Sequence, residues 1–579
     1  MDDLLAGKLA YVFYASIVDA TILSLIALVW FRRSMRGLMQ SGSGVAAAGA
    51  DMPDRAAFDG PPAASVVPAR LSFALYGPGK APVTATSSDT HRPARRRLVI
   101  AYTLGAAAYA IVLTSLRLGT QHLPFVAWLV RGWVEMWPLV PSLVALLAVD
   151  RRSSVRLAGA YLGIGLVAVF AVTLGGQLLR GTLNAAPLTN LYWMLVSLAL
   201  VVYAPLALIV VSGWRRIRAI MPLAIAGTVA FGFALLAFGS AMVRILDVGG
   251  LRSALLDAGA VVSVTATYYG LFLVASLPVG WVIWRLLRRL ARAFERKRFS
   301  DVQLIVDCWW AIVAAEQATL LSTELGYYAV AGALAAFAAY RIVVAVALRM
   351  MPAQDQAPQR LLLLRVFGYQ SRTESLFDRI AHAWRFDGPV HLIAGADLAS
   401  RSVTPGLMLR FLSGTLEAQY VATGDDVAAR IGALDAKPDP DGRFRVNDVY
   451  CRNDIWHAAL VALLAASDRV LMDVRSFSTQ NQGCVFELEQ LLLRLPTQAI
   501  VLLIDAQTDV RLLGSTLCAS WSRAREGGRA RGDGTLALVK VERNRPGDLR
   551  YVAQRLRGGD HAQALVVTEE IAEAAKVAA

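Results

Sequence analysis

Apolar runs of about 20 residues recur between Leu9 and Met350, and this feature restricts the first part of the chain to a membrane protein. Such runs have the length of a helix that crosses the hydrocarbon core of a bilayer. After Pro352 the apolar runs shorten to the length of strands. Apolar residues make up 56% of the 579 residues and charged residues only 17%, too apolar a balance for one soluble domain. The sequence therefore predicts a polytopic helical membrane domain followed by a water-soluble domain.

Seven apolar runs are expected to be membrane helices. The first, Leu9–Phe31, is too long for a signal peptide, and no basic cluster precedes it. The other six are Leu98–Leu118, Pro124–Val149, Leu157–Leu179, Leu191–Ser212, Ile220–Val243 and Val261–Trp284. Residues 301–351 form either a helical hairpin, with Ser322–Gly326 as its outer turn, or a juxtamembrane stalk. The membrane domain is thus expected to have about seven to nine spans.

The distribution of Lys and Arg predicts the orientation of these spans. Segments 32–98, 150–156, 214–219 and 285–300 hold 23 basic residues, and the alternate segments 1–8, 119–123, 180–190 and 244–260 hold 4. Basic loops remain in the cytosol. We therefore expect a protein of the cell (inner) membrane with its N-terminus outside and its C-terminal domain in the cytosol. The basic stretch Arg285–Arg298 either binds anionic lipid headgroups or is a solvated helical extension.

Composition predicts the organisation of the rest of the chain. Residues 32–97 are rich in Ala, Gly, Pro and Ser without a sustained period, which predicts a disordered cytosolic loop. The expected organisation is a first helix (1–31), this loop, a helical bundle (98–300), the hairpin or stalk (301–351) and a cytosolic domain (352–579). The net charge of +15 has a topological explanation, so no nucleic-acid partner is expected. Four widely spaced cysteines indicate neither a disulfide framework nor a metal site.

Three ionisable residues inside the apolar runs are candidates for an intramembrane polar site: Asp19, Arg131 and Glu135. A charge within a span is costly and is a functional hypothesis by default. Arg131 and Glu135 are four residues apart, so they lie on one helical face and can pair. A structural pair near the outer interface and a ligand site both remain open.

From Leu361 onward the pattern alternates between strands and helices, which predicts an α/β, doubly wound, flavodoxin-like domain with a parallel sheet. The continuous apolar runs Leu361–Leu364 and Ile500–Ile504 are typical of central strands that are buried on both faces. The other expected elements are Ser371–Phe386, Val390–Ala394, Pro405–Ser413, Asn453–Ala466, Val470–Val474, Gly483–Leu495, Thr508–Arg523 and Thr535–Val541. Thr415–Cys451 is expected to be an irregular insert with a turn at Asp439–Gly442.

Open parallel sheets bind ligands at the carboxyl ends of their strands. Polar loops follow three of the expected strands there, and the third leads into a helix that carries Glu487 in its first turns. A carboxylate in that position can act on a glycosidic carbon, although Glu487 is equally well explained as a surface residue of an amphipathic helix. Asp473 and Asp505 end strands and are expected to orient loops. The candidate ligand-binding residues are Gly368, Tyr369, Arg372, Asp473, Ser476, Asn481 and Gly483.

These residues resemble motifs of two related families. Phe367-Gly368-Tyr369 and Cys484-Val485-Phe486-Glu487-Leu488 resemble TIR domains, in which the second motif is preceded by Trp, here replaced by Gly483. Asn481-Gln482-Gly483-Cys484-Val485-Phe486-Glu487 resembles the nucleoside 2-deoxyribosyltransferases, with amides in place of their acidic pair. The resemblance implies that Glu487 is catalytic, that NAD or a related nucleotide is bound, that an N-glycosidic bond is cleaved, and that the domain self-associates.

We therefore expect a membrane-anchored sensor or effector with a cytosolic nucleotide-binding domain. A non-enzymatic interaction module on a membrane anchor is one alternative, since many TIR domains act in this way. A transporter with a regulatory cytosolic domain is the other, and it would depend on Asp19, Arg131 or Glu135.

Overall fold

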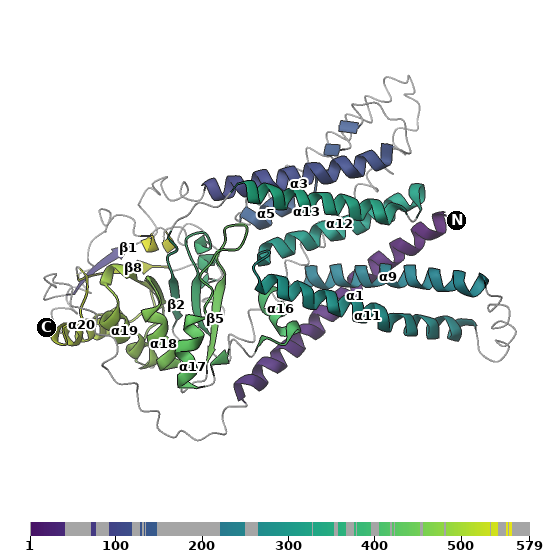
Figure 1. Ribbon diagram of the computed structural model, residues 1–579. Helices are drawn as coiled ribbons and strands as arrows, with labels where there is room; N and C mark the ends of the chain where they lie inside the picture. Colours follow the sequence, from purple (N-terminus) through teal and green to yellow (C-terminus); the bar gives the residue numbers. More distant parts are fainter. Residues whose placement is uncertain are drawn as a thin grey trace. The chain divides into compact units, whose positions relative to one another are not determined.

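The computed structural model divides the chain into two compact units (Figure 1). The helical unit comprises Met1–Phe31, Arg95–Pro352 and Val403–Gly414, and the sheet unit comprises Arg32–Ala94, Ala353–Ser402 and Thr415–Ala579. The structure describes residues 2–40, 71–76, 92–118, 128–129, 132–133, 135–147, 220–248, 264–326, 328–351, 357–365, 376–377, 379–381, 383–394, 405–416, 420–421, 423–451, 455–479, 482–532, 534–541, 552–553 and 555–557.

Long apolar helices make up the helical unit. They are α1 (Asp2–Gln40), α3 (Arg92–Leu118), α5 (Leu139–Leu147), α9 (Met221–Val248), α11 (Val264–Glu295), α12 (Asp301–Leu325) and α13 (Tyr328–Met350). Within the described residues, four segments are long and apolar enough to cross a membrane: Pro93–Arg117, Met221–Phe238, Asp301–Ser322 and Tyr328–Met350. Helix α1 covers the expected span Leu9–Phe31, and helix α11 covers most of the expected span Val261–Trp284, but neither is among these four segments. The expected spans Leu157–Leu179 and Leu191–Ser212 lie outside the described residues.

Helices α12 and α13 form a hairpin (Figure 1). Helix α12 begins at a capping box, in which the Gln303 N–H donates to Ser300 Oγ and the Ser300 N–H donates to Gln303 Oε1. It ends at Gly326, whose φ of 54° favours glycine. Asp307 on α12 pairs with Arg341 on α13 at 2.6 Å. Helix α12 continues through Leu325, so the chain reverses after it, at Gly326, the last residue of the expected turn Ser322–Gly326.

One short helix from the C-terminal half of the chain belongs to the helical unit. Helix α16 (Pro405–Ser413) was expected to cover the sheet, but it packs on α11 instead. Its Leu409 is fully buried against Phe294 and Phe299. The local pattern predicted the helix correctly, but an amphipathic face does not specify which apolar surface covers it.

The sheet unit contains eight strands, all of which are parallel. They are β1 (Ser72–Tyr76), β2 (Leu361–Arg365), β3 (Val390–Ala394), β4 (Tyr420–Val421), β5 (Val446–Cys451), β6 (Arg469–Asp473), β7 (Ile500–Ile504) and β8 (Thr535–Lys540). Their spatial order is β1-β8-β7-β6-β2-β3-β5-β4. The helices between them are α17 (Gly424–Gly432), α18 (Trp456–Ala465), α19 (Gln482–Arg494) and α20 (Val510–Glu526), with a short 3-10 helix at Thr497–Ala499.

Each face of the sheet has its own apolar core. Leu362 and Leu364 of β2 pack on one face with residues of α18, α19 and α20. Leu361 and Leu363 pack on the other face with Leu376 and Trp384. All five residues of β7 are buried. The prediction that the apolar runs Leu361–Leu364 and Ile500–Ile504 are strands buried on both sides is therefore confirmed.

Three strands were not expected from the sequence. Strand β1 lies in the segment predicted to be a disordered loop, and it pairs with β8 from Ser72↔Thr535 to Tyr76↔Val539. Strands β4 and β5, together with α17, lie in the segment predicted to be an irregular insert. The turn at Asp439–Gly442 is confirmed, since the Gly442 N–H donates to the Asp439 carbonyl at 2.8 Å. The pairing partners of β1 and β5 are distant in sequence, so no local signal marked them.

Candidate functional site

The order of the strands reverses between β2 and β6. After β2 the chain continues to β3 on one side, and after β6 it continues to β7 on the other. In open parallel sheets, ligands commonly bind at the carboxyl edge beside such a switch point. Arg365 and Asp473 are the paired last residues of the two strands. The sheet therefore brings the loop after β6 to the position that the sequence predicted for a ligand.

A buried ion pair holds the first part of that loop. Asp473 accepts hydrogen bonds from Arg475 Nε and Nη2, both at 2.7 Å. Burial alone would lower the pKa of Arg475, but the hydrogen bonds and charge of Asp473 outweigh it and raise that pKa. Both carboxylate oxygens of Asp473 are thus engaged within the loop. This is the loop-orienting role that the sequence favoured, and it leaves Asp473 a poor candidate for direct ligand contact.

The next residue, Ser476, adopts a left-handed conformation with a φ of 59°. Non-glycine residues rarely take this conformation unless their surroundings impose it. Here the Ser476 N–H donates to Asp505 Oδ1 at 3.0 Å, and Thr508 Oγ1 donates to the same oxygen at 2.9 Å. Asp505, which follows β7, therefore fixes the loop after β6. A strained, tightly held residue at the switch point is consistent with a preorganised site.

Glu487 lies five residues after the first residue of α19, and only 3% of its surface is exposed. The alternative that it is a surface residue is therefore wrong. Glu489, on the same helix, is the surface residue, since it is partly exposed and pairs with Arg523 at 3.2 Å. Glu487 is thus a buried acidic group in the second turn of α19.

Three aromatic side chains lie beside the start of α19. Trp456 stacks on His457 with 3.9 Å between ring centroids, and Phe486 meets His457 edge-on at 4.4 Å. Partial burial lowers the pKa of His457, so its ring is neutral at neutral pH. A Cβ atom on Gly483 would lie 3.9 Å from the Trp456 ring, which places this aromatic cluster next to the α19 N-terminus. The cluster is not visible in the sequence because Trp456 and Phe486 are 30 positions apart.

Several expected site residues lie outside the described part of the chain. These are Gly368, Tyr369, Arg372, Asn481 and the intramembrane Arg131. Of the described candidates, Ser476, Gly483 and Glu487 follow β6 at the carboxyl edge. Asp19 is exposed on α1.

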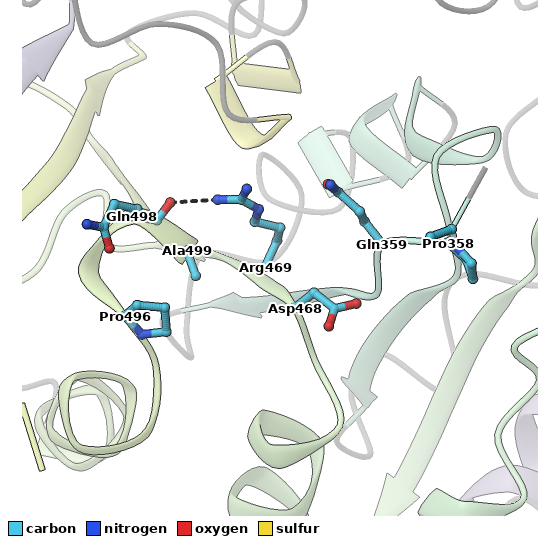
Figure 2. Close-up of a pocket in the computed structure, with 8 residues that line it drawn as sticks. Pro358, Gln359, Asp468, Arg469, Pro496, Gln498 and Ala499 are labelled. Atoms are coloured by element: carbon cyan, nitrogen blue, oxygen red, sulfur yellow. Dashed lines mark hydrogen bonds between the residues drawn. The ribbon is translucent and has the colours of Figure 1, made fainter. Parts of the chain in front are cut away.

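A pocket of about 490 Å³ lies at the opposite edge of the sheet, beside the amino ends of β2, β6 and β7. Figure 2 shows that Arg469 donates to the backbone carbonyl of Gln498, at 2.8 Å. Asp468 accepts from the Arg360 N–H at 2.8 Å. The polar groups of this pocket therefore hold neighbouring chain segments together. We place the candidate site at the carboxyl edge, where the buried Glu487 lies on the helix that follows β6.

The helical unit contains a separate buried polar cluster. Arg117, in the last turn of α3, lies 3.7 Å from Glu135 and donates to Gln317 of α12 at 2.6 Å. The expected pair of Glu135 with Arg131 stays a prediction, because Arg131 lies outside the described residues. Arg117 is a partner of Glu135 that was not expected from the sequence. Arg117 and Glu135 are 18 positions apart and belong to different helices, which is why spacing along one helix did not reveal the contact.

Replacing Arg117 by Met is expected to destabilise the protein more than replacing both Arg117 by Met and Glu135 by Gln. Removing one partner of a buried pair leaves an uncompensated charge and costs about 3–5 kcal/mol. The midpoint of thermal unfolding in detergent, followed with a thiol-reactive dye that reports exposure of the buried cysteines Cys308, Cys451 and Cys484, measures the difference. The exposed Arg289→Met is the control and should change the midpoint little. If the double variant loses more stability than Arg117→Met alone, Arg117 and Glu135 do not stabilise each other.

The basic end of α11 is exposed and carries paired Trp and Arg side chains. Arg285 lies 4.3 Å over the Trp281 ring, and Arg288 lies 5.2 Å over the Trp284 ring. Arg289, Arg292, Arg296 and Arg298 are also exposed. Trp and Arg side chains commonly anchor helices at the level of lipid headgroups.

Comparison with known protein families, with curated proteins and with solved structures finds no match to this chain. The resemblance to TIR domains and nucleoside 2-deoxyribosyltransferases therefore depends on the short motifs around Tyr369 and Glu487.

Proposed function

We propose that this chain is a multi-pass protein of the inner membrane, with about seven to nine spans, whose sheet unit binds NAD or a related nucleotide. The ligand would occupy the carboxyl edge at β2 and β6, and the protein would act as a sensor or effector. The observation that carries this proposal is the burial of Glu487 beside the aromatic cluster at the start of α19. The order β3-β2-β6-β7-β8 has the pattern of a flavodoxin-like sheet, which binds its ligand at the equivalent switch point.

Three features support a nucleotide rather than another small ligand. The first N–H groups of α19 suit a phosphate or a ribose hydroxyl. The rings of Trp456, His457 and Phe486 provide an apolar surface against which a base can pack. The Glu487 carboxylate can accept hydrogen bonds from ribose hydroxyls or act at a glycosidic carbon.

The test is calorimetric titration of the full-length protein in detergent with NAD, purine nucleosides and nicotinamide, together with chromatography for released base. Binding with release of nicotinamide or a free base supports an effector enzyme, and binding without release supports a sensor. No binding by the full-length protein would leave the interaction module as the better account. The full chain is needed because a fragment that begins at residue 352 lacks β1.

Strand pairing supports the proposed orientation. Strand β1 precedes the membrane helices from α3 onward, whereas β8 follows them, yet the two strands pair. Both strands must lie on one side of the membrane, so an even number of crossings between them is required. A hairpin of α12 and α13 provides two of these crossings, and the excess of basic residues favours the cytosol for both strands.

Reporter fusions test this orientation. Alkaline phosphatase fused to the C-terminus is expected to be inactive, and a fluorescent protein fused there is expected to fluoresce, because the C-terminus is cytosolic. Fusions after residue 60 should behave in the same way, since that segment precedes β1. An active C-terminal phosphatase fusion would contradict both the orientation and the hairpin.

Two partners follow from the same proposal. Anionic lipids would bind the Arg285–Arg298 stretch through its exposed guanidinium groups. A second copy of the chain would associate through the sheet unit. A transporter with a regulatory domain is the second candidate function, and the buried cluster at Arg117 and Glu135 favours it.

A further inference from the structure

Arginines gather at the edge of the sheet unit where its parallel strands begin. The helices between parallel strands run back to this edge, so the last turns of α19 and α20 lie there together with the start of β6. Positive charge prevails in the stretches 468–469, 489–499 and 523–534, which contain six arginines and four acidic residues. The arginines, called here the amino-edge basic surface, are Arg469, Arg494, Arg523, Arg525, Arg529 and Arg531.

Hydrogen bonds join the segments that carry these arginines. Arg469 Nη1 donates to the Gln498 carbonyl at 2.8 Å, so the start of β6 lies beside the 3-10 helix that follows α19. The Thr497 N–H donates to the Arg531 carbonyl at 3.2 Å, which places the loop after α20 against the same 3-10 helix. A Cβ atom on Gly532 would lie 2.5 Å from Gln498 Oε1, so this approach is close. The three segments are therefore in direct contact and present their charges on one edge.

The loop after α20 holds two of the arginines on a well-ordered support. Ala530 is buried in the core, and the N–H groups of Arg529 and Ala530 donate to one carbonyl of α20 at 2.8 and 3.0 Å. Gly528 and Gly532 allow the chain to turn on either side, with φ values of 65° and 99°. Arg529 and Arg531, which flank Ala530, are exposed. Binding of an anionic partner through them therefore requires little ordering of the backbone.

The chain enters this edge of the sheet directly after a segment that can cross a membrane. Helix α13 ends at Met350, and β2 begins eleven positions later at Leu361, which is paired with Arg469. Eleven extended residues reach at most about 40 Å. The amino edge is thus covalently restricted to the neighbourhood of a bilayer surface.

We propose that the amino-edge basic surface binds the anionic headgroups of the membrane that carries the chain. Guanidinium groups bind phosphate oxygens through paired hydrogen bonds, and an anionic bilayer presents many phosphates in one plane. This surface belongs to the sheet unit and is distinct from the Arg285–Arg298 stretch of α11. It also lies at the edge opposite to the candidate nucleotide site. The inference goes beyond nucleotide binding and does not depend on it.

Hydrogen exchange of the full-length protein in nanodiscs, measured by mass spectrometry, tests the proposal. The backbone amides of residues 523–532 are expected to exchange more slowly in discs that contain phosphatidylglycerol than in discs of phosphatidylcholine alone. High salt should remove the difference, because it screens the attraction. Arg529→Glu should reduce this protection by at least about tenfold, since each cation near an anionic bilayer strengthens binding about fivefold. Arg511→Glu, the same charge change at an exposed residue in the first turn of α20, should retain the protection.

Arg531→Glu repeats the measurement at a second exposed position, and the midpoint of thermal unfolding checks that each variant is folded. Equal exchange in the two kinds of disc would overturn the proposal. Equal loss of protection in Arg511→Glu and Arg529→Glu would also overturn it, because overall charge would then attract the sheet unit. Binding of a labelled oligonucleotide that is lost in Arg529→Glu, without any effect of lipid, would overturn it in favour of a nucleic-acid surface. All samples lack nucleotide, so a failure of nucleotide binding is a separate result.

Discussion

Glu487→Gln is expected to weaken nucleotide binding by the sheet unit, and to slow any cleavage of NAD, while the protein remains folded. A neutral amide of the same size cannot act as a nucleophile or stabilise a positively charged glycosidic centre. If the protein cleaves NAD, turnover should fall by at least about 100-fold. If it only binds a nucleotide, affinity should fall about tenfold or more, because a hydrogen bond to a charged group contributes about 1.5–3 kcal/mol. Calorimetry and base release by the full-length protein measure the two outcomes.

Glu489→Gln is the matched control for this change. It removes a carboxylate from the same helix, but one that is partly exposed and pairs with Arg523 on the surface. Exposed pairs contribute little, so binding and thermal stability should stay close to those of the wild type. If both variants bind and react like the wild type, Glu487 is a structural residue, and the carboxyl edge at α19 is not the site.

Phe73→Asp in β1 is expected to destabilise the sheet unit strongly. Phe73 is buried in the core on one face of the sheet, and truncating a buried aromatic residue costs about 3–5 kcal/mol before the cost of burying a charge is added. Loss of β1 would also expose the edge of β8, which favours association with other chains. Thermal unfolding and size-exclusion chromatography of the full-length protein should show a lower midpoint and more aggregate.

Phe73→Leu provides the control for this prediction, since it keeps an apolar side chain in the strand. It should shift the unfolding midpoint much less than Phe73→Asp. A full-length Phe73→Asp protein with the stability and elution volume of the wild type would show that β1 does not contribute to the sheet in solution.

The sequence predicted those elements whose local residue pattern is diagnostic. The continuous apolar runs of β2 and β7 marked central strands, and the Asp439–Gly442 turn was recognisable from its residues alone. Strand β1 was missed because its five residues stand in an Ala- and Pro-rich segment and acquire strand character only through β8. Strand β5 was missed because Asn447 and Asp448 interrupt its apolar pattern.

The candidate sites were predicted only in part, for a similar reason. The position of Glu487 in a helix after β6 followed from local motifs, but its burial depends on how α19 packs against its neighbours. In the helical unit, Glu135 was recognised as a costly charge, whereas its partner Arg117 belongs to another helix. Contacts between distant segments are set by packing, which residue spacing along one element does not encode.

The pairing of β1 with β8 has a consequence for the synthesis of the chain. Ser72 and Thr535 are 463 positions apart, and the four segments that are long and apolar enough to cross a membrane are made between them. At a translation rate of about 5–20 residues per second, β1 must wait roughly 20 to 90 seconds for its partner strand. During that interval a nascent chain with a truncated C-terminus would carry an unpaired strand tethered to inserted helices. Completion of the sheet is thus a late event that distinguishes full-length chains from prematurely terminated ones.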